Sequence, residues 1–542
     1  MAFMAAMNAM DTGLPAGMKH GANGAICYSE EGIGDLRVAL YTSLVRGITH
    51  DSVHEFLDKL DKSNIPEADR VRDTWLIAMQ GRDVRGGKGE RDAFYELFAE
   101  FSCRRPLSET MKLLELVPEY GCWRDMFFLM HENPLLIAPI EAIICKQFFK
   151  DLAAARSSGS QISLLAKWLP REKADERMAK NISEALYPSI TNEKGRLALY
   201  RKHCSEINRA LKTVEVAQCG GTWRTIEPAH VPGRALKLYR KAFLNEKLNG
   251  REGVRSEKED RIVCAERFRE HLGKVARGEA TVKGADTVFP HEIVQKIART
   301  RSVEEEQLLE GQWAAIREKV AASGKLAGKC VPMCDFSGSM SGTPLQVSMA
   351  LGILLSEVNH PAFRDGMLTF DSDPHWLSFR PEMSLAQKVG YAGMHGQGLS
   401  TNFEAALKLV LQRMIDAKVP VGEEPDALVV FTDMGFDAAC RSGTRDYDTI
   451  LERFQKQFAM AGGWKVPTIV IWNLRAEYKD YHALVDRKGV IMLSGWSPSS
   501  MKILMNGIKV QTPYEAMREI LDDKRYDAVR GALSVAQQTT AA

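Results

Sequence analysis

The sequence lacks the marks of a secreted or membrane-spanning protein. Its 542 residues include only 10 cysteines, and none forms a Cys-x-x-Cys pair or groups with histidines at zinc spacing. Scattered cysteines are typical of a reducing compartment. No apolar run approaches the roughly eighteen residues of a spanning helix, and the start MAFMAAMNAM has no basic residue. We therefore expect a soluble, intracellular and cytoplasmic protein.

Sequence signatures of an enzyme are missing as well. There is no Gly-x-Ser-x-Gly elbow, no His-Glu-x-x-His zinc motif and no Walker-type phosphate loop. The stretch RGGKGE at 85–90 has glycines and a lysine, but at the wrong spacing for a phosphate loop, and it follows a helical pattern. We therefore expect that the protein is not an enzyme, and we predict no catalytic residue.

Charge is balanced overall and uneven along the chain. The 72 Lys and Arg residues exceed the 70 Asp and Glu residues by only two. Residues 161–280 nevertheless carry 25 basic against 16 acidic residues, whereas residues 330–542 carry 21 against 24. A basic middle segment favours an interaction surface, although a set of solvated helix faces would give the same counts.

Apolar periodicity predicts a helical part from residue 34 to 328. Stretches such as DSVHEFLDKLDKS and RDAFYELFAEFS repeat apolar residues every three or four positions, as amphipathic helices do. Successive short helices predict an α-helical repeat (HEAT-like) domain over 34–328, preceded by an N-terminal segment, 1–33. Within this domain we expect the charged segment 245–261 to be an exposed loop or insertion.

From residue 329 the period changes. The compact apolar runs KCVPMCDFS, GMLTFDSD, DALVVFTDM, VPTIVIWNLR and GVIMLSGWS alternate with helical patterns. Strands alternating with helices predict a doubly wound, parallel sheet over 329–542. The expected fold class is therefore α + α/β, with the helical domain first and the sheet domain last.

Oxygen-bearing side chains follow several of these predicted elements. Asp335, Ser337 and Ser339 come after the first strand, Asp433 ends a later strand, and Thr401 precedes a helix. Ligands of doubly wound sheets bind beyond the carboxyl ends of strands, so we expect these side chains to converge. Carboxylates and hydroxyls suit Mg²⁺, with Mn²⁺ or Ca²⁺ as alternatives. Asp and Ser are also common in turns and helix caps, which leaves a structural role open.

The motifs DFSGSM, STNF and FTDM together resemble the metal-ion-dependent adhesion site (MIDAS) of von Willebrand factor A domains. The resemblance implies a Rossmann-like domain over 329–542. It also implies that one metal position stays open for a carboxylate of a partner protein. The ligands that it implies are Asp335, Ser337, Ser339, Thr401 and Asp433.

In the helical part, RDVRGGKGERDAFYELF and LVPEYGCWRDMFFLM are similar to the helical-repeat (TROVE) domain of Ro ribonucleoproteins. This resemblance implies repeats that form a ring closed by a von Willebrand A domain, and binding of single-stranded RNA ends or small structured RNAs. Over the whole chain, GTWRTIEPAHVPGRALKLYRKAFL, FPHEIV and LSGWS resemble the domain-of-unknown-function family 2828, which implies an architecture without an activity.

Under the Ro-like interpretation, basic side chains would contact RNA phosphates and aromatic ones would stack on bases. The basic candidates are Lys167, Arg171, Lys173, Arg201, Lys202, Arg234, Lys237, Arg240 and Lys241. The aromatic residues between them are Trp168, Tyr200, Trp223 and Tyr239, which at helical spacing are more often core residues. Basic residues that extend this patch, or only solvate a loop, are Arg82, Arg85, Lys88 and Arg91.

Two functions follow from these patterns. One is a non-enzymatic, Ro-like scaffold that binds RNA through a basic helical surface. The other is a protein-interaction or assembly module whose metal site captures an acidic residue of a partner. The sequence leaves open the natural ligand, the oligomeric state, and whether the helical part is a closed ring or an open arc.

Overall fold

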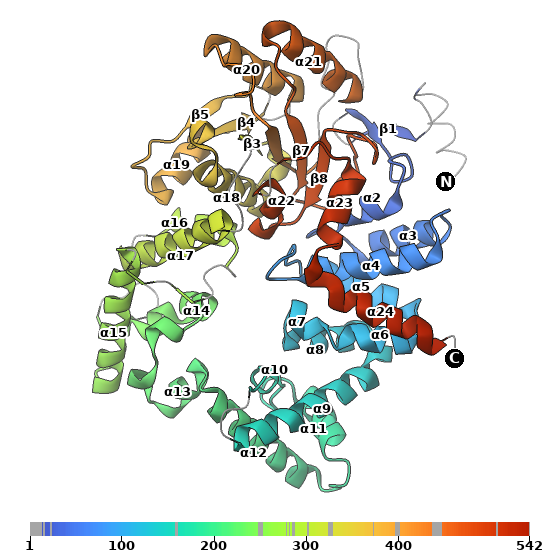
Figure 1. Ribbon diagram of the computed structural model, residues 1–542. Coiled ribbons are helices and arrows are strands. Elements are labelled where there is room, and N and C mark those ends of the chain that lie inside the picture. The colour runs from blue at the N-terminus through green and yellow to red at the C-terminus, as the bar shows by residue number, and fades with distance from the viewer. Residues whose placement is uncertain are drawn as a thin grey trace. The chain divides into compact units, whose positions relative to one another are not determined.

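The computed structural model contains two compact units, whose elements are labelled in Figure 1. Unit 1 comprises Met1–Phe94 and Ala285–Asp527, and unit 2 comprises Tyr95–Gly284 and Ala528–Ala542. The residues that the structure describes are 14, 17–21, 24–157, 161–247, 253–277, 279–280, 282–283, 288–300, 303–322, 329–371, 373–395, 402–435, 447–505 and 508–540. Helices and a C-terminal, mostly parallel sheet confirm the predicted α + α/β class.

Unit 1 is built around a six-stranded sheet in the order β5-β4-β3-β6-β7-β8. Its strands are β3 (Cys330–Asp335), β4 (Gly366–Phe370), β5 (Trp376–Ser378), β6 (Ala427–Thr432), β7 (Thr468–Asn473) and β8 (Val490–Ser494). Neighbouring strands are parallel except β4 and β5, which are antiparallel. The five parallel strands lie in the five predicted apolar runs. The sequence did not predict β5, because three residues with one fully buried side chain make no apolar run.

Helices cover both faces of this sheet. The helices on one face are α16 (Pro290–Ile297), α17 (Val303–Ala322), α18 (Thr343–Val358) and α19 (Leu385–His395). The helices on the other face are α20 (Phe403–Asp416) and α21 (Tyr447–Gly462). Successive strand residues point to opposite faces, so Cys334 packs with the first group and Met333 with the second.

Close packing of α18 on β3 requires a glycine. A Cβ atom on Gly352 would lie 2.2 Å from the Sγ atom of Cys334, which is far inside van der Waals contact. All residues of β3, β6, β7 and β8 are buried, as parallel strands covered on both faces require. Burial of each Val, Leu or Ile side chain contributes about 1.5–3 kcal/mol, so this sheet is the main core of unit 1.

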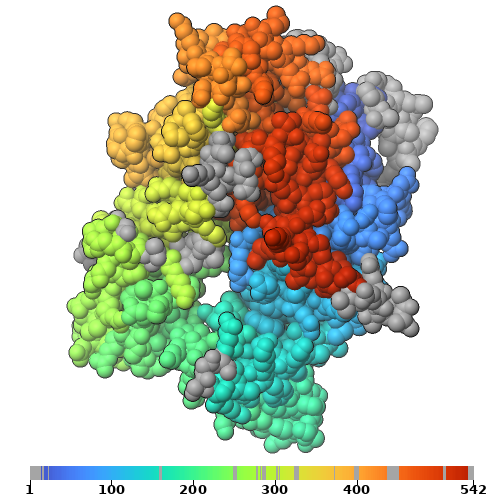
Figure 2. Space-filling view, viewed as in Figure 1, coloured from blue at the N-terminus to red at the C-terminus, as the bar shows by residue number. Residues whose placement is uncertain are grey.

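The first 94 residues belong to the same unit as the sheet. Figure 2 shows this segment, in blue, lying directly against the red residues near the C-terminus. Its elements are β1 (Met18–His20), β2 (Ile26–Tyr28), α2 (Leu36–Ser43), α3 (His50–Asp61) and α4 (Glu67–Arg82). We expected 1–33 to be a separate segment and 34–94 to be part of the repeat domain, whereas the contacts group both with the sheet.

Two side chains show how the N-terminal segment meets the sheet. Asn473, the last residue of β7, donates to the carbonyl of Thr42 at 3.1 Å. Ser494, the last residue of β8, donates to the carbonyl of Tyr41 at 2.9 Å. The C-terminus of α2 therefore lies on the carboxyl edge of β7 and β8.

Short helices complete unit 1 after β8. They are η7 (Pro498–Met501), α22 (Lys502–Met505), α23 (Pro513–Leu521) and η8 (Lys524–Tyr526), and short η5 (Gly338–Met340) and η6 (Pro361–Phe363) lie earlier. A capping box begins α23: the hydroxyl of Thr512 accepts from the Glu515 amide at 3.1 Å, and the Glu515 carboxylate accepts from the Thr512 amide at 2.9 Å.

Unit 2 is helical. Its helices are α6 (Leu107–Leu114), α7 (Val117–Tyr120), α8 (Trp123–Glu132), α9 (Ile137–Arg156), α10 (Leu165–Trp168), α11 (Glu176–Leu186), α12 (Glu193–Leu211), α13 (Val214–Gly220), α14 (Gly233–Phe243) and α15 (Glu259–Ala276), with short η1 (Pro134–Leu136), η2 (Trp223–Thr225) and η3 (Pro228–His230). Two further helices, α5 (Asp92–Cys103) and α24 (Asp527–Thr540), have residues in both units.

The segment 245–261 is less of a loop than expected. The side chain of Asn245 is buried and makes two hydrogen bonds with the backbone of Ser256, at 2.7 and 3.0 Å. Helix α15 begins at Glu259, inside the expected loop, and residues 248–252 lie outside the described part. Residues 247, 253–255 and 257–259 are exposed, as expected, and only the two ends of the segment differ, because a buried Asn and a helix start look polar in sequence.

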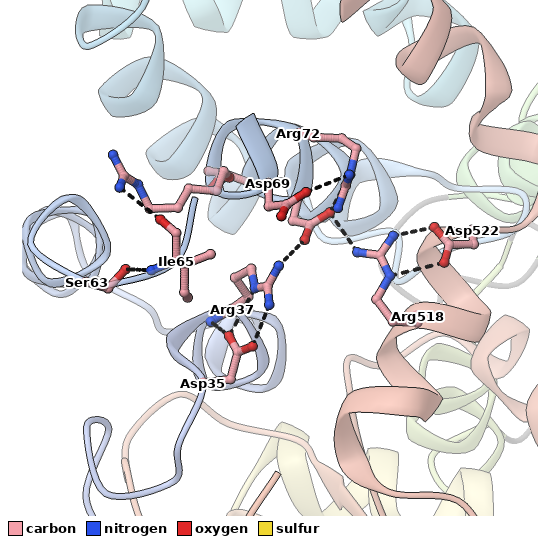
Figure 3. Close-up of polar contacts among 11 residues, drawn as sticks. Asp35, Arg37, Ser63, Ile65, Asp69, Arg72, Arg518 and Asp522 are labelled. Carbon is pink, nitrogen blue, oxygen red and sulfur yellow. Dashed lines mark hydrogen bonds and ion pairs between the residues drawn. The ribbon is translucent and has the colours of Figure 1, made fainter. Parts of the chain in front are cut away.

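A buried carboxylate joins three elements of unit 1. Asp73 on α4 is fully buried and accepts from Arg37 at 2.8 Å, from Arg72 at 3.0 Å and from Arg518 at 2.6 Å. Figure 3 shows these three arginines converging from α2, α4 and α23. A buried charge is stable only when it is paired and hydrogen-bonded, and here three guanidinium groups meet that requirement.

Replacing Asp73 with alanine is expected to lower the free energy of unfolding by about 3 kcal/mol, because the change removes the fully buried carboxylate that three arginines share and leaves Arg37 with Asp35 alone. The matched control is Asp69→Ala, which removes a half-exposed partner of Arg72 on the same helix, 2.8 Å away. That change should cost less than about 1 kcal/mol. Urea unfolding of both variants measures the difference, and equal losses would contradict this role of Asp73.

Candidate metal centre at the carboxyl edge of the sheet

The strand order of the sheet reverses at β3, which lies between β4 and β6. In doubly wound sheets, the crevice at such a reversal, beyond the carboxyl ends of the strands, is the usual ligand site. Asp335 is the last residue of β3, and Asp433 directly follows β6. The sequence therefore positions two of the expected metal ligands on the two strands that flank the crevice.

Asp335 is fully buried, and each of its carboxylate oxygens accepts a hydrogen bond. The amide of Ser337 donates to Oδ1 at 2.8 Å, and the hydroxyl of Thr432 donates to Oδ2 at 2.7 Å. Thr432 is the last residue of β6, so this second bond joins the two strand ends. These bonds fix the plane of the carboxylate.

The other described ligands lie in the loops beside it. The hydroxyls of Ser337 and Ser339 are 3.0 Å apart. Asp433 is fully buried; its Oδ1 accepts from the amide of Gly435 at 3.0 Å, while its Oδ2 has no hydrogen-bond partner within the described residues. A buried carboxylate oxygen without a partner is costly unless a cation or a donor satisfies it.

Burial perturbs both carboxylates, and repulsion by Asp433 adds to the shift of Asp335. Burial, followed by the charge of Asp433, raises the pKa of Asp335 to about 7. Burial also raises the pKa of Asp433, although the nearby Ser339 hydroxyl opposes the shift. Among the described residues, neither carboxylate forms an ion pair with a lysine or arginine. Two adjacent buried acids with hydroxyls beside them, and only the nearby charge of Arg475 to offset that of Asp433, fit a hard divalent ion.

The remaining expected ligand, Thr401, lies outside the described residues. In the part of the chain that the structure describes, no group of three or more His, Cys, Asp or Glu residues has the geometry of a metal site. A metal at this edge would therefore depend on hydroxyl oxygens beside only two carboxylates, which favours Mg²⁺ over Zn²⁺.

Two residues that sequence reasoning missed hold the loops of this site. Arg475, after β7, donates to the carbonyl of Ser339 at 2.8 Å. The Nε2 atom of the buried His482 lies 2.8 Å from the carbonyl of Met434, whose φ of 74° is left-handed. Both side chains act on backbone atoms next to the ligands, so no motif of ligand types marks them in the sequence.

The stretch RGGKGE lies against the same sheet, at the ends of β7 and β8. Lys88 is fully buried; its amine donates to the carbonyl of Leu44 at 3.2 Å and to that of Tyr41, whose ring lies 4.1 Å away. The next turn places Glu90, also buried, 3.0 Å from Arg46. Lys88 thus satisfies carbonyls at the C-terminus of α2, as basic groups do at helix ends.

Part of the expected basic patch is buried, so that part of the prediction was wrong. Lys88 and Arg82 are both buried, so they do not belong to an exposed surface. Burial lowers the pKa of Lys88 from 10.5 to about 7, in spite of the opposing charge of Glu90. The sequence pattern missed this because a lysine between glycines is usually solvated.

The basic candidates of unit 2 divide by their contacts. Three are ion-paired: Lys167 with Glu215 at 3.0 Å, Arg201 with Glu172 at 2.6 Å, and the buried Arg240 with Glu246 at 3.1 Å. Arg171 and Lys237 are half-buried. The candidates that are exposed and have no ion pair within the described residues are Lys173, Lys202, Arg234 and Lys241.

The aromatic candidates are mostly part of the packing. Tyr200 is fully buried and donates to the carbonyl of Pro170 at 2.7 Å, so it offers no face to a base. Trp223 is covered by the guanidinium of Arg261, 3.7 Å from its ring centre. Trp168 and Tyr239 are half-buried. The core interpretation is therefore correct for Tyr200.

Comparison with known proteins shows which families this chain resembles. Two family models match this chain, and the matched segments meet near residue 328. Residues 135–326, in the helical part, match "Domain of unknown function (DUF2828)". Residues 329–540, in the sheet part, match "Domain of unknown function (DUF7788)". The likeness to family 2828 therefore applies to the helical part and not to the whole chain. Neither matching model is named for a von Willebrand A or a Ro-type family.

The chain is also 30% identical to "Uncharacterized protein L728" of Acanthamoeba polyphaga mimivirus over 445 residues. The match covers 78% of this chain and 75% of the viral protein. The chain belongs to the same family as this mimivirus protein. Within the described residues, no helix is long and apolar enough to cross a membrane.

The buried amine of Lys88 is expected to make stability depend on pH. Because its folded pKa of about 7 lies below the 10.5 of the free side chain, the unfolded chain binds more protons between these values. Stability therefore rises as pH increases above 7. From pH 7 to 9, the wild type should gain on the order of 2 kcal/mol relative to Lys88→Met, measured by urea unfolding.

The control is Lys62→Met, which changes an exposed lysine at the end of α3. Its stability should follow the wild type at both pH values. Parallel pH dependence of the wild type and Lys88→Met would mean that Lys88 keeps its proton when buried, and would contradict this account of the α2 terminus.

Proposed function

We propose that residues 329–542 form a von Willebrand A-type domain that binds a divalent cation and, through it, an acidic side chain of a partner protein. The observation that carries the proposal is the pair of buried carboxylates, Asp335 and Asp433, on the two strand ends that flank the reversal of the sheet. The protein acts in this account as an interaction module and not as an enzyme.

The residues that would hold the ion are Asp335, Ser337, Ser339 and Asp433, with Thr401 as the fifth ligand by resemblance. Their oxygens suit Mg²⁺, which keeps waters or a ligand oxygen in its remaining positions. When bound, the ion would supply a positive charge to which a partner's carboxylate can dock. Asp433 and Asp335 would lose their repulsion, and the unpartnered oxygen of Asp433 would be satisfied.

The positions of Arg475 and His482 support a fixed rather than an adaptable site. Arg475 holds the backbone of the first loop, and His482 contacts the backbone of the loop that follows β6. A metal site binds selectively when outer residues orient its ligands. The backbone of Ser339 and that of Met434 are therefore held before the ion or a partner arrives.

RNA binding by unit 2 is the second candidate function. It is favoured by the exposed cations Lys173, Lys202, Arg234 and Lys241, of which Arg234 and Lys241 lie on one side of α14, two turns apart. Such side chains neutralise phosphates without reading sequence. A Ro-type arrangement, with helical repeats closed into a ring by the sheet domain, belongs to this candidate.

The experiment is affinity capture by the full chain in Mg²⁺, followed by elution with EDTA. We expect a protein partner to elute with EDTA and to be lost with Ser339→Ala, because one hydroxyl ligand of the ion is removed. Ser341→Ala is the matched control, since Ser341 is exposed in the same loop and is not a predicted ligand. Mass spectrometry of the eluate, and competition by an acidic peptide, identify the bound group.

Other outcomes of this capture separate the two functions. A partner that stays bound in EDTA, or that binds Ser339→Ala as well as the wild type, would contradict the metal-dependent proposal. Recovered RNA that leaves with salt rather than EDTA would favour the second candidate. Reversing the charges of Lys202 and Lys241 should then remove the RNA.

A further inference from the structure

Unit 1 contains a cavity of about 350 Å³ that lies apart from the predicted metal ligands. Four separate parts of the chain meet around it: the C-terminal end of α4 with the loop after it, the C-terminal turns of α17, the stretch of η7 and α22, and the stretch of α23 and η8. Volumes of about 300–1,000 Å³ are typical of small-molecule sites. This cavity is therefore large enough for a small organic ligand.

The wall of the cavity is mainly apolar. Ile316 and Val320 of α17 and Ile503 of α22 line it and are buried. The ring of Tyr526 is buried in the same wall, and its hydroxyl is used within the protein, since it donates to Asp83 at 3.2 Å. Such a wall favours an apolar body in the ligand.

The charged side chains of the lining are already partnered. Their ion pairs are Arg525 with Asp83 at 2.7 Å, Lys502 with Asp523 at 2.7 Å and Glu519 with Lys509 at 3.3 Å. Neither Arg85 nor Lys319, which also line the cavity, is without a partner. A charged group of a ligand would lose hydration here without meeting a free counter-charge, so the lining favours an uncharged ligand.

The edge formed by the loop after α4 is fixed before a ligand arrives. Asp83 is fully buried and holds the guanidinium of Arg525. A Cβ atom on Gly86 would lie 2.8 Å from Cδ of Arg525, so the glycine lets the stem of this arginine lie along the loop. A preformed edge lowers the entropy cost of binding, because few side chains have to be ordered.

Two serines give the cavity a polar end. Ser499 and Ser500 of η7 line it, and the Ser499 amide donates to the hydroxyl of Ser497 at 3.2 Å, which fixes the start of this short helix. Ser500 is only 8% exposed, yet in the part of the chain that the structure describes neither the Ser499 nor the Ser500 hydroxyl makes a hydrogen bond. A buried hydroxyl without a partner is costly, and a ligand hydroxyl satisfies it because it both donates and accepts.

We propose that this cavity binds a small, uncharged apolar alcohol. The apolar body of the ligand packs against Ile316, Ile503 and the ring of Tyr526, and its hydroxyl meets those of Ser499 and Ser500. The cavity is separate from the metal centre, so this inference does not depend on the proposed function.

Ligand-detected NMR titration of the full chain tests the proposal with three probes that share one frame: 4-ethylbenzyl alcohol, 4-ethylbenzoate and 4-ethylbenzylammonium. The alcohol should bind at least tenfold more tightly than either ion, because the lining offers a charged group no free counter-charge. The proposal is overturned if either ion binds as tightly as the alcohol, or if no probe binds and the cavity holds only water.

Ser500→Ala removes one hydroxyl and should weaken binding of the alcohol about fivefold, the loss expected for one neutral hydrogen bond. Binding of 4-ethyltoluene, which has the same frame without a hydroxyl, should be unchanged, and a general loss of structure would not give that result. The control is Ser378→Ala, because Ser378 is exposed on β5 and lies outside the cavity lining. Equal effects of the two substitutions on the alcohol, or an equal loss of both ligands in Ser500→Ala, would overturn the proposal.

Discussion

The structure of unit 1 depends on how the carboxyl edge of β7 and β8 is covered. The C-terminus of α2 lies across this edge, and its carbonyls are satisfied by Asn473, by Ser494 and by the buried amine of Lys88. Unpaired backbone carbonyls in such a place would be costly, so these contacts require the first 94 residues to fold with the last third of the chain. The buried charge of Asp73 joins the same segments.

That arrangement divides the edge of the sheet into two halves with different chemistry. At β7 and β8 the carbonyls at the end of α2 are paired with side chains, which makes this half a structural joint. At β3 and β6 the carboxylates of Asp335 and Asp433 face each other's charge, and one oxygen has no partner. Folded proteins keep such uncompensated groups mainly at functional sites, which is why we propose the metal-dependent function for this half.

The sequence predicted the helices and strands that have a regular apolar spacing, and the acidic residues of a type that binds metal. The five parallel strands and the helices between them follow from apolar spacing, and Asp335 and Asp433 follow from their places after strands. It did not predict β5, which is too short, or the pairing of the N-terminal residues with the sheet, which depends on contacts across more than 400 positions. Nor did it predict the burial of Lys88 or the contact of Arg475 with the Ser339 carbonyl, because neither the burial of one lysine nor a bond to a distant backbone atom leaves a local pattern.

Thermal unfolding with and without Mg²⁺, at pH 8, tests the central claim most directly. The account predicts that Mg²⁺ stabilises the wild type, as any ligand of the folded state does. Asp433→Asn should be more stable than the wild type without metal, because one of two repelling buried charges is removed, and should not respond to Mg²⁺. Asp373→Asn, an exposed carboxylate near the end of β4, should behave as the wild type. A wild type that is indifferent to Mg²⁺, or an Asp433→Asn variant that responds equally, would contradict the account.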